Sequence, residues 1–153
     1  MGLTTVTNQS AYQGQINVLI VGSLAGGTGC GSFLQVAFAV RDLAPNQTKL
    51  HVRGLFLMPD VYVRGAGLAR DQAANVTTNG MAALREVNAL LQATAHDKDR
   101  LEVLNFEYMP GRKVKFGQIP FDTVTLIDYE MTNGQSLGPS LDRYKDLLTR
   151  AAY

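Results

Sequence analysis

A strand, a glycine-rich turn and a helix follow one another over residues 16–42, and this unit limits the possible fold more than any other stretch. The apolar run at 16–21 has the composition of a buried parallel strand. Apolar residues over 33–40 then recur at helical spacing. Between the two lie five glycines: Gly22, Gly26, Gly27, Gly29 and Gly31. The unit predicts an α/β domain that begins with a strand, a tight turn and a packed helix.

Such a turn can bind phosphate, because glycine lets the backbone approach an anion and the first N–H groups of a helix have no partner within it. The turn is not the GxxxxGK[ST] loop, since no lysine follows the last glycine. It also fits a dinucleotide motif poorly, because Asp42 ends the first helix instead of following the second strand. Close packing of a helix on a sheet also selects glycine, so a purely structural turn stays an alternative.

The segment Ala25–Gly31, AGGTGCG, resembles the signature loop GGGTG[SA]G of the tubulin/FtsZ superfamily. The longer run at 21–43 is similar to bacterial tubulin-like proteins outside the FtsZ group. The resemblance implies an α/β, Rossmann-like three-layer fold with a mostly parallel sheet. It also implies that the loop holds GTP or GDP, with Mg²⁺ bound through the phosphates. The residues implied to bind phosphate are Gly26, Gly27, Thr28, Gly29, Cys30 and Gly31.

A second strand, parallel to the first, is predicted at 49–58, where polar and apolar residues alternate before a continuous apolar run. A loop is predicted at 44–47 before it and a long loop at 59–75 after it. In the superfamily the equivalent of the long loop reaches the ribose, which implies a contact from Asp60 or Arg64. An exposed loop with no ligand is the alternative.

An amphipathic helix is predicted at 79–95 and capped by Thr77 or Thr78. Residues 79–86 are similar to the NAYAAL-type segment of bacterial tubulin-like proteins, which is a second matching motif in the expected order. A β-hairpin insertion is predicted from strands at 101–109 and 113–119 around a Pro-Gly-Arg turn. The predicted buried face of the helix consists of five residues: Met81, Leu84, Val87, Leu91 and Ala95.

A third parallel strand is predicted at 121–128 and a final helix at 140–152. The strand resembles the tubulin strand that ends in IDN, whose asparagine recognises guanine. Tyr129 stands at the asparagine position, and a tyrosine ring can stack on a base but has no paired amide donor and acceptor. Asn133 is an alternative reader of the base. The resemblance thus implies that Asp128, Tyr129 and Asn133 lie near the base.

We expect residues 1–15 to be a flexible lead-in and residues 16–153 to form a single, partial nucleotide-binding domain. The resemblance implies a polymerising GTPase that forms homo-oligomers or filaments, in which the catalytic acid comes from the next subunit. GTP hydrolysis is therefore expected only of the intact polymer, and no catalytic residue is assigned in this chain. The alternative is a structural or interaction domain that keeps the fold without binding or hydrolysing nucleotide.

Composition excludes several other classes of protein. The formal charge is +1 and 18% of the 153 residues are charged, which argues against a nucleic-acid footprint. No apolar run reaches about 18 residues and no signal segment is present, so a cytoplasmic protein without a membrane span is expected. His51 and His96 show no metal-ligand spacing. A cysteine enzyme, with Cys30 activated at a helix N-terminus and His51 as base, is a remote alternative.

Overall fold

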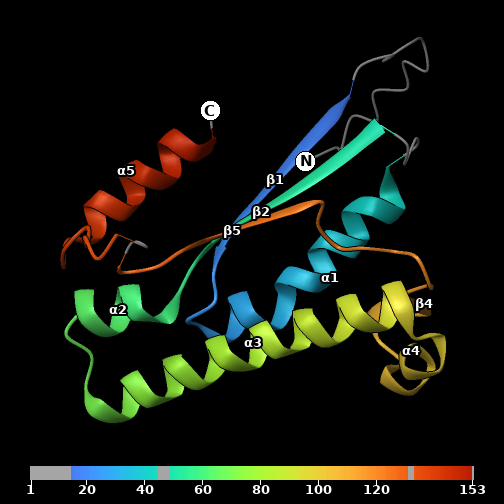
Figure 1. The fold of residues 1–153 in the computed structure, drawn as a ribbon, viewed down its shortest axis with the longest axis horizontal. Coiled ribbons are helices and arrows are strands. Elements are labelled where there is room, and N and C mark those ends of the chain that lie inside the picture. The colour runs from blue at the N-terminus through green and yellow to red at the C-terminus, as the bar shows by residue number, and fades with distance from the viewer. Residues whose placement is uncertain (1–14, 45–48, 131–132, 153) are drawn as a thin grey trace, which may run out of the picture.

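The computed structural model of the chain describes residues 15–44, 49–130 and 133–152, without the side chains of the last two. In these residues the central sheet has three strands, β1 (Ile16–Ser23), β2 (Leu50–Leu57) and β5 (Thr123–Ile127), in the order β1-β2-β5. Both pairings are parallel, as predicted (Figure 1). The predicted lead-in and the turn before the second strand lie almost wholly outside the described residues.

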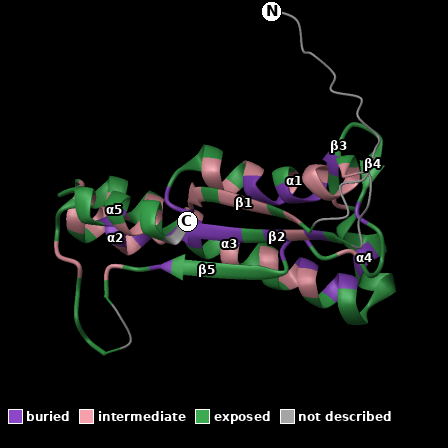
Figure 2. Cartoon of the chain, turned by 90° about the horizontal axis from the view of Figure 1, so that it is seen from above, coloured by how far each residue is buried: buried purple, intermediate pink, exposed green. Residues whose placement is uncertain are grey.

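Helices cover both faces of this sheet. Helices α1 (Gly27–Leu43) and α3 (Arg70–His96) pack on one face, and α5 (Leu141–Ala152) lies on the other face near the carboxyl ends of the strands (Figures 1 and 2). The first face carries the larger core, whose centre is an aromatic cluster. The ring of Phe56 lies 5.4 Å from that of Phe33 and 5.6 Å from that of Phe121. Gly54 leaves the space that these rings fill.

A second, smaller core joins the opposite face of the sheet to α5 and to the short helix α2 (Pro59–Gly65). The buried residues of this core are Leu55, Leu57, Val61, Ile127 and Tyr144. Because these strand residues lie near the carboxyl ends of β2 and β5, this core holds α2 and α5 at the edge of the sheet where the site is predicted. The three-layer α/β fold inferred from the sequence is thus confirmed.

The predicted loop at 59–75 is wrong, because most of it is helical. Pro59 begins α2, a position where its fixed φ and missing N–H are compatible with a helix. Asp60 and Arg64 form an ion pair one turn apart, at 3.3 Å. Helix α3 then starts at Arg70, nine residues before the predicted start. Only residues 66–69 separate the two helices.

The early start of α3 also overturns its predicted cap. Thr77 and Thr78 lie inside the helix, where their hydroxyls donate hydrogen bonds to the carbonyls of Ala73 and Ala74. The predicted buried face is only partly right, because Leu84 and Val87 pack against the larger core whereas Met81 is 49% exposed. Four of the five fully buried positions of the helix are small residues that allow close approach, and the fifth is a leucine: Gly80, Ala83, Ala93, Thr94 and Leu90.

The insertion contains a hairpin, but a shorter one than predicted. Residues 98–104 form helix α4 (Lys98–Leu104), because the Asp97 carboxylate caps it by accepting a hydrogen bond from the Arg100 N–H at 2.9 Å. Strands β3 (Glu107–Met109) and β4 (Arg112–Lys113) then pair antiparallel. Figure 2 places α4, β3 and β4 at the end of the molecule opposite the arrowheads of β1 and β5, far from the predicted site.

Candidate functional site

The predicted phosphate-binding turn connects β1 directly to α1. Only residues 24–26 separate the strand from the helix, so Gly27 to Gly31 form the first turns of α1 rather than a loop. Gly26 is the N-cap residue, with an extended backbone (φ −100°, ψ 152°) and no side-chain cap. The first turn of the helix has no acidic residue. The N–H groups of this turn therefore keep the hydrogen-bonding capacity and partial positive charge that favour an anion.

The carbonyl oxygens of the turn are held by the protein. The Cys30 thiol donates a hydrogen bond to the Leu24 carbonyl at 2.9 Å, and the Cys30 N–H donates to the Gly26 carbonyl at 3.0 Å. The side-chain amide of Asn79, on α3, donates to the Ala25 carbonyl at 3.3 Å. Because these oxygens are engaged, an approaching anion meets N–H groups rather than repulsive carbonyls.

The glycines of the turn have two different structural roles. A Cβ atom on Gly29 would collide with the carbonyl oxygen of Ser23, so packing requires glycine there. A Cβ atom on Gly26, Gly27 or Gly31 would meet no atom within 4 Å. Packing within the described residues thus gives no reason for these three glycines, whereas an anion resting on the backbone would.

A shallow cleft of about 330 Å³ adjoins the turn. It is lined by Ser23, Ala25, Gly26, Tyr62, Leu68 and Val76. The turn thus faces an open, mostly apolar hollow between the end of β1 and helices α2 and α3, in which a bound group would be accessible from solvent. The turn and the cleft together fit a phosphate-bearing ligand.

Cys30 faces inward rather than toward this cleft. Its thiol and its N–H are both hydrogen bonded, to Leu24 and Gly26. Partial burial, with a smaller effect from the Glu86 carboxylate, raises the pKa of the thiol above its ordinary value. A raised pKa is the opposite of what a cysteine nucleophile needs, so the structure gives the cysteine-enzyme alternative no support.

Three of the other predicted site residues come together where β2 and β5 end. Arg64, on α2, makes ion pairs with Asp60 at 3.3 Å and with Glu130 at 3.5 Å. Its guanidinium carbon lies 5.3 Å from the centre of the Tyr129 ring, which is a cation–π contact. The structure therefore joins Asp60, Arg64 and Tyr129 into one cluster, which Glu130 completes.

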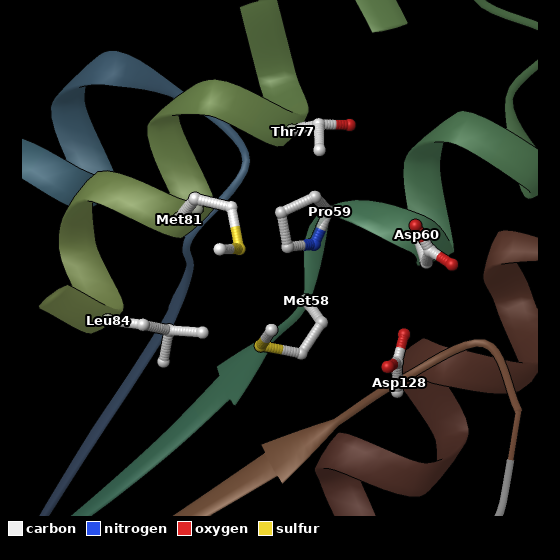
Figure 3. Close-up of a pocket in the computed structure, with 8 residues that line it drawn as sticks. Met58, Pro59, Asp60, Thr77, Met81, Leu84 and Asp128 are labelled. Atoms are coloured by element: carbon white, nitrogen blue, oxygen red, sulfur yellow. The ribbon is translucent and has the colours of Figure 1, made fainter. Parts of the chain in front are cut away.

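Asp128 is not part of this cluster but shares with Asp60 the lining of a small cavity of about 100 Å³. Figure 3 shows Asp60 and Asp128 on one side of this cavity and Met58, Met81 and Leu84 on the other. The cavity is too small for a nucleoside, since sites for such ligands measure about 300 Å³ or more. The side chain of Asn133 forms hydrogen bonds with the side chain and the backbone N–H of Gln135.

The turn and the cluster lie at the same edge of the sheet. Parallel strands are about 4.8 Å apart, so the end of β1 is about 10 Å from the end of β5, with β2 between them. Two contributors were not predicted as site residues. Glu130 belongs to no sequence motif that would identify it as a site residue. Asn79 is the first residue of the segment at 79–86 that resembles tubulin-like proteins, and this position could have identified it.

Comparison with known proteins agrees with this architecture. The family model of tubulin-like proteins matches residues 2–149. The chain belongs to the tubulin-like family. No curated protein and no solved structure matched this tubulin-like chain. Among its described residues, no helix is both long and apolar enough to cross a membrane.

Proposed function

We propose that this tubulin-like chain binds a guanine nucleotide, GTP or GDP, with the phosphates on the turn before α1. The observation that carries the proposal is the uncapped start of α1, where three glycines adjoin open space and the carbonyls of the turn are held by Cys30 and Asn79. Gly27, Thr28 and Gly29 supply the first N–H groups of the helix, which have no partner within it.

The same proposal assigns the rest of the nucleotide to the edge of the sheet. The ribose lies over the end of β2, near Asp60 and Arg64, and the base lies near Tyr129 after β5. The separation of about 10 Å between the ends of β1 and β5 suits an extended nucleotide that crosses β2. Mg²⁺ bound through the phosphates would neutralise part of their charge.

We also propose self-association into oligomers or filaments in a cytoplasmic, bacterial setting, with GTP hydrolysis only in the intact polymer. Family membership supports this proposal, and so do the outer edges of β1 and β5, which pair with no other strand in the part of the chain that the structure describes. Val124 and Leu126 on β5 are more than 40% exposed. Unpaired, uncharged strand edges favour association. Sedimentation with and without GTP tests this, and an unchanged monomer under both conditions would contradict it.

The direct test of nucleotide binding uses two substitutions of Gly26. Gly26→Asp places a carboxylate at the N-cap position, where it can accept hydrogen bonds from the free N–H groups of α1. The side chain of the variant then occupies the place of the bound phosphate. We expect Gly26→Asp to be more stable than the wild type by roughly a few tenths of a kcal/mol, and to lose nucleotide binding. Gly26→Ala adds a Cβ into open space without a charge and is the matched control.

Thermal unfolding with Mg²⁺ plus GTP, GDP or ATP is the measurement. A ligand at 100 times its Kd stabilises the folded state by about 2.7 kcal/mol. We expect a nucleotide-dependent rise in Tm for the wild type and for Gly26→Ala, and none for Gly26→Asp. A wild-type Tm that no nucleotide changes would contradict the proposal and favour a structural domain that keeps the fold alone.

A further inference from the structure

The sheet face that carries the second core is open over the first half of its strands. On this face the buried strand residues are confined to the carboxyl ends, at Leu55, Leu57 and Ile127. Figure 2 likewise places α5 beside α2 at the arrowhead end of β5. Before that end, Arg53 is exposed although β2 is the central strand. In the part of the chain that the structure describes, no helix covers this half of the face, whereas parallel sheets normally carry helices on both faces.

A shallow hollow of about 330 Å³ lies on this open half of the face. Its lining side chains come from all three strands: Leu19, His51, Arg53, Leu55, Thr123 and Thr125. The strand register aligns Leu19, Arg53 and Thr123 in one row across the sheet. Val21, two residues after Leu19 and on the same face, is 49% exposed. The hollow therefore joins apolar surface on β1 to basic and hydroxyl groups on β2 and β5.

Arg53 gives the hollow a positive charge that no described carboxylate neutralises. Among the described residues, Arg53 forms no ion pair. The Asp122 carboxylate, just before β5, is held by the Arg41 guanidinium group at 2.8 Å and by the Val52 N–H at 2.7 Å. A partner that covers the hollow removes Arg53 from water, which is unfavourable unless the partner supplies an opposite charge. The hollow thus requires a partner with both an apolar surface and a carboxylate.

We propose that this open half of the sheet face docks an amphipathic helix of a partner polypeptide, whose apolar stripe covers Leu19 and Val21 and whose aspartate or glutamate pairs with Arg53. The open part of β2, residues 50–54, is about 16 Å long, which is the length of about three helical turns. A helix is about 10 Å wide and therefore covers about three strands. The surface differs from the strand edges proposed for self-association, because its side chains rather than its backbone groups make the contacts. It is also independent of nucleotide binding.

The probe is a display library of three-turn helical peptides with leucine at positions i, i+3, i+4 and i+7 and random residues elsewhere, selected on the folded chain. We expect aspartate or glutamate to be enriched at one position beside the leucine stripe. The selected peptide should bind Arg53→Glu about tenfold or more weakly than the wild type. Replacing its acidic residue by lysine should restore binding to Arg53→Glu and weaken binding to the wild type. Arg70→Glu, which changes an exposed arginine on α3, is the matched control and should bind as the wild type.

Backbone amide signals in NMR spectra locate the bound peptide, and those of Leu19, Arg53 and Thr123 should shift most. A selection that yields no binder, or binders without a preferred acidic position, would overturn the proposal. Equal affinities for Arg53→Glu and the wild type, or amide shifts confined to another surface, would do the same. If the signals of these three residues change with the concentration of the chain alone, a second copy occupies the face, and the proposed partner helix is wrong.

Discussion

The carbonyl oxygen of Ser23 occupies the space that a Cβ atom on Gly29 would need, so the end of β1 and the first turn of α1 are in direct backbone contact. Gly31, two residues later, adjoins open space. The signature loop thus contains glycines of two kinds, one required by packing and others that leave the backbone accessible. A substitution at Gly29 therefore destabilises the fold, and its effect on ligand binding cannot be separated from that loss of stability.

The two kinds of glycine predict opposite effects on stability. Gly29→Ala should lower the free energy of unfolding by about 1–3 kcal/mol, because the backbone of β1 and α1 must separate. Gly31→Ala should raise it by about 0.5–1 kcal/mol, because alanine favours a helix and has room there. Urea unfolding of both variants checks this, and equal effects would show that the contact between Ser23 and Gly29 is not tight.

Asn79 holds the turn from α3 through one hydrogen bond to the Ala25 carbonyl. Asn79→Ala should lower the free energy of unfolding by about 0.5–1.5 kcal/mol and weaken nucleotide binding, because the turn loses a support that orients its N–H groups. Asn88→Ala, at an exposed position of the same helix, is the control. Isothermal titration calorimetry measures the nucleotide affinity of both variants. An affinity as high in Asn79→Ala as in the control would mean that this hydrogen bond does not orient the turn.

The ion pair of Asp122 and Arg41 predicts a pH dependence of stability. Partial burial alone would raise the pKa of Asp122, but hydrogen bonds from the Val52 N–H at 2.7 Å and from Arg41 at 2.8 Å outweigh this effect and lower it. A carboxyl group with a lower pKa in the folded chain contributes stability above its unfolded pKa of about 3.9. That stability is lost as the pH falls through the folded pKa.

Asp122→Asn should therefore lower the free energy of unfolding at neutral pH by about 1–3 kcal/mol. Its stability should also fall less steeply than that of the wild type on acidification. Denaturant unfolding at several pH values measures both effects. Asp142→Asn, at an exposed position that pairs only with Lys145 among the described residues, is the control and should behave as the wild type. Parallel acid profiles for Asp122→Asn and the wild type would contradict the assignment.

The raised pKa of Cys30 predicts that its thiol reacts slowly with alkylating reagents. In the folded chain, alkylation by iodoacetamide near neutral pH should be slower than in the chain unfolded by guanidinium, because burial and the Glu86 carboxylate disfavour the thiolate. The rate should rise only in alkaline solution. Mass spectrometry of the labelled protein follows this reaction. Faster labelling of the folded chain would reopen the possibility of a nucleophilic cysteine.

The three strands of the central sheet were predicted well from the sequence because each contains a short run rich in apolar and β-branched residues, although only β2 is buried along most of its length. The helices were predicted less well. Residues 59–75 contain two glycines and scattered charged residues, and only the ion pair of Asp60 with Arg64 and the proline at the helix start reveal α2 in retrospect. The buried face of α3 was only partly predicted, because Leu84 and Val87 pack on the larger core but the closest approach to Pro59 is made by Gly80, which has no side chain to mark it.

The candidate site likewise has one part that the sequence predicted and one part that it did not. The turn at 24–31 was recognisable because its glycines are adjacent in sequence and match a family signature. The cluster of Arg64, Tyr129 and Glu130 depends on the crossover that brings β5 beside β2, and local patterns do not encode that contact. The role of Asn79 likewise appears only when α3 is packed against the turn.

The most direct test of the account is a titration of the folded, isotope-labelled chain with the Mg²⁺ complex of GTP, followed by the backbone amide signals in NMR spectra. The account predicts that the amide signals of Gly27, Thr28 and Gly29 shift most, and that the same signals stay in place in Gly26→Asp. If saturating nucleotide leaves these three amide signals unchanged in the wild type, the turn before α1 is not the phosphate site.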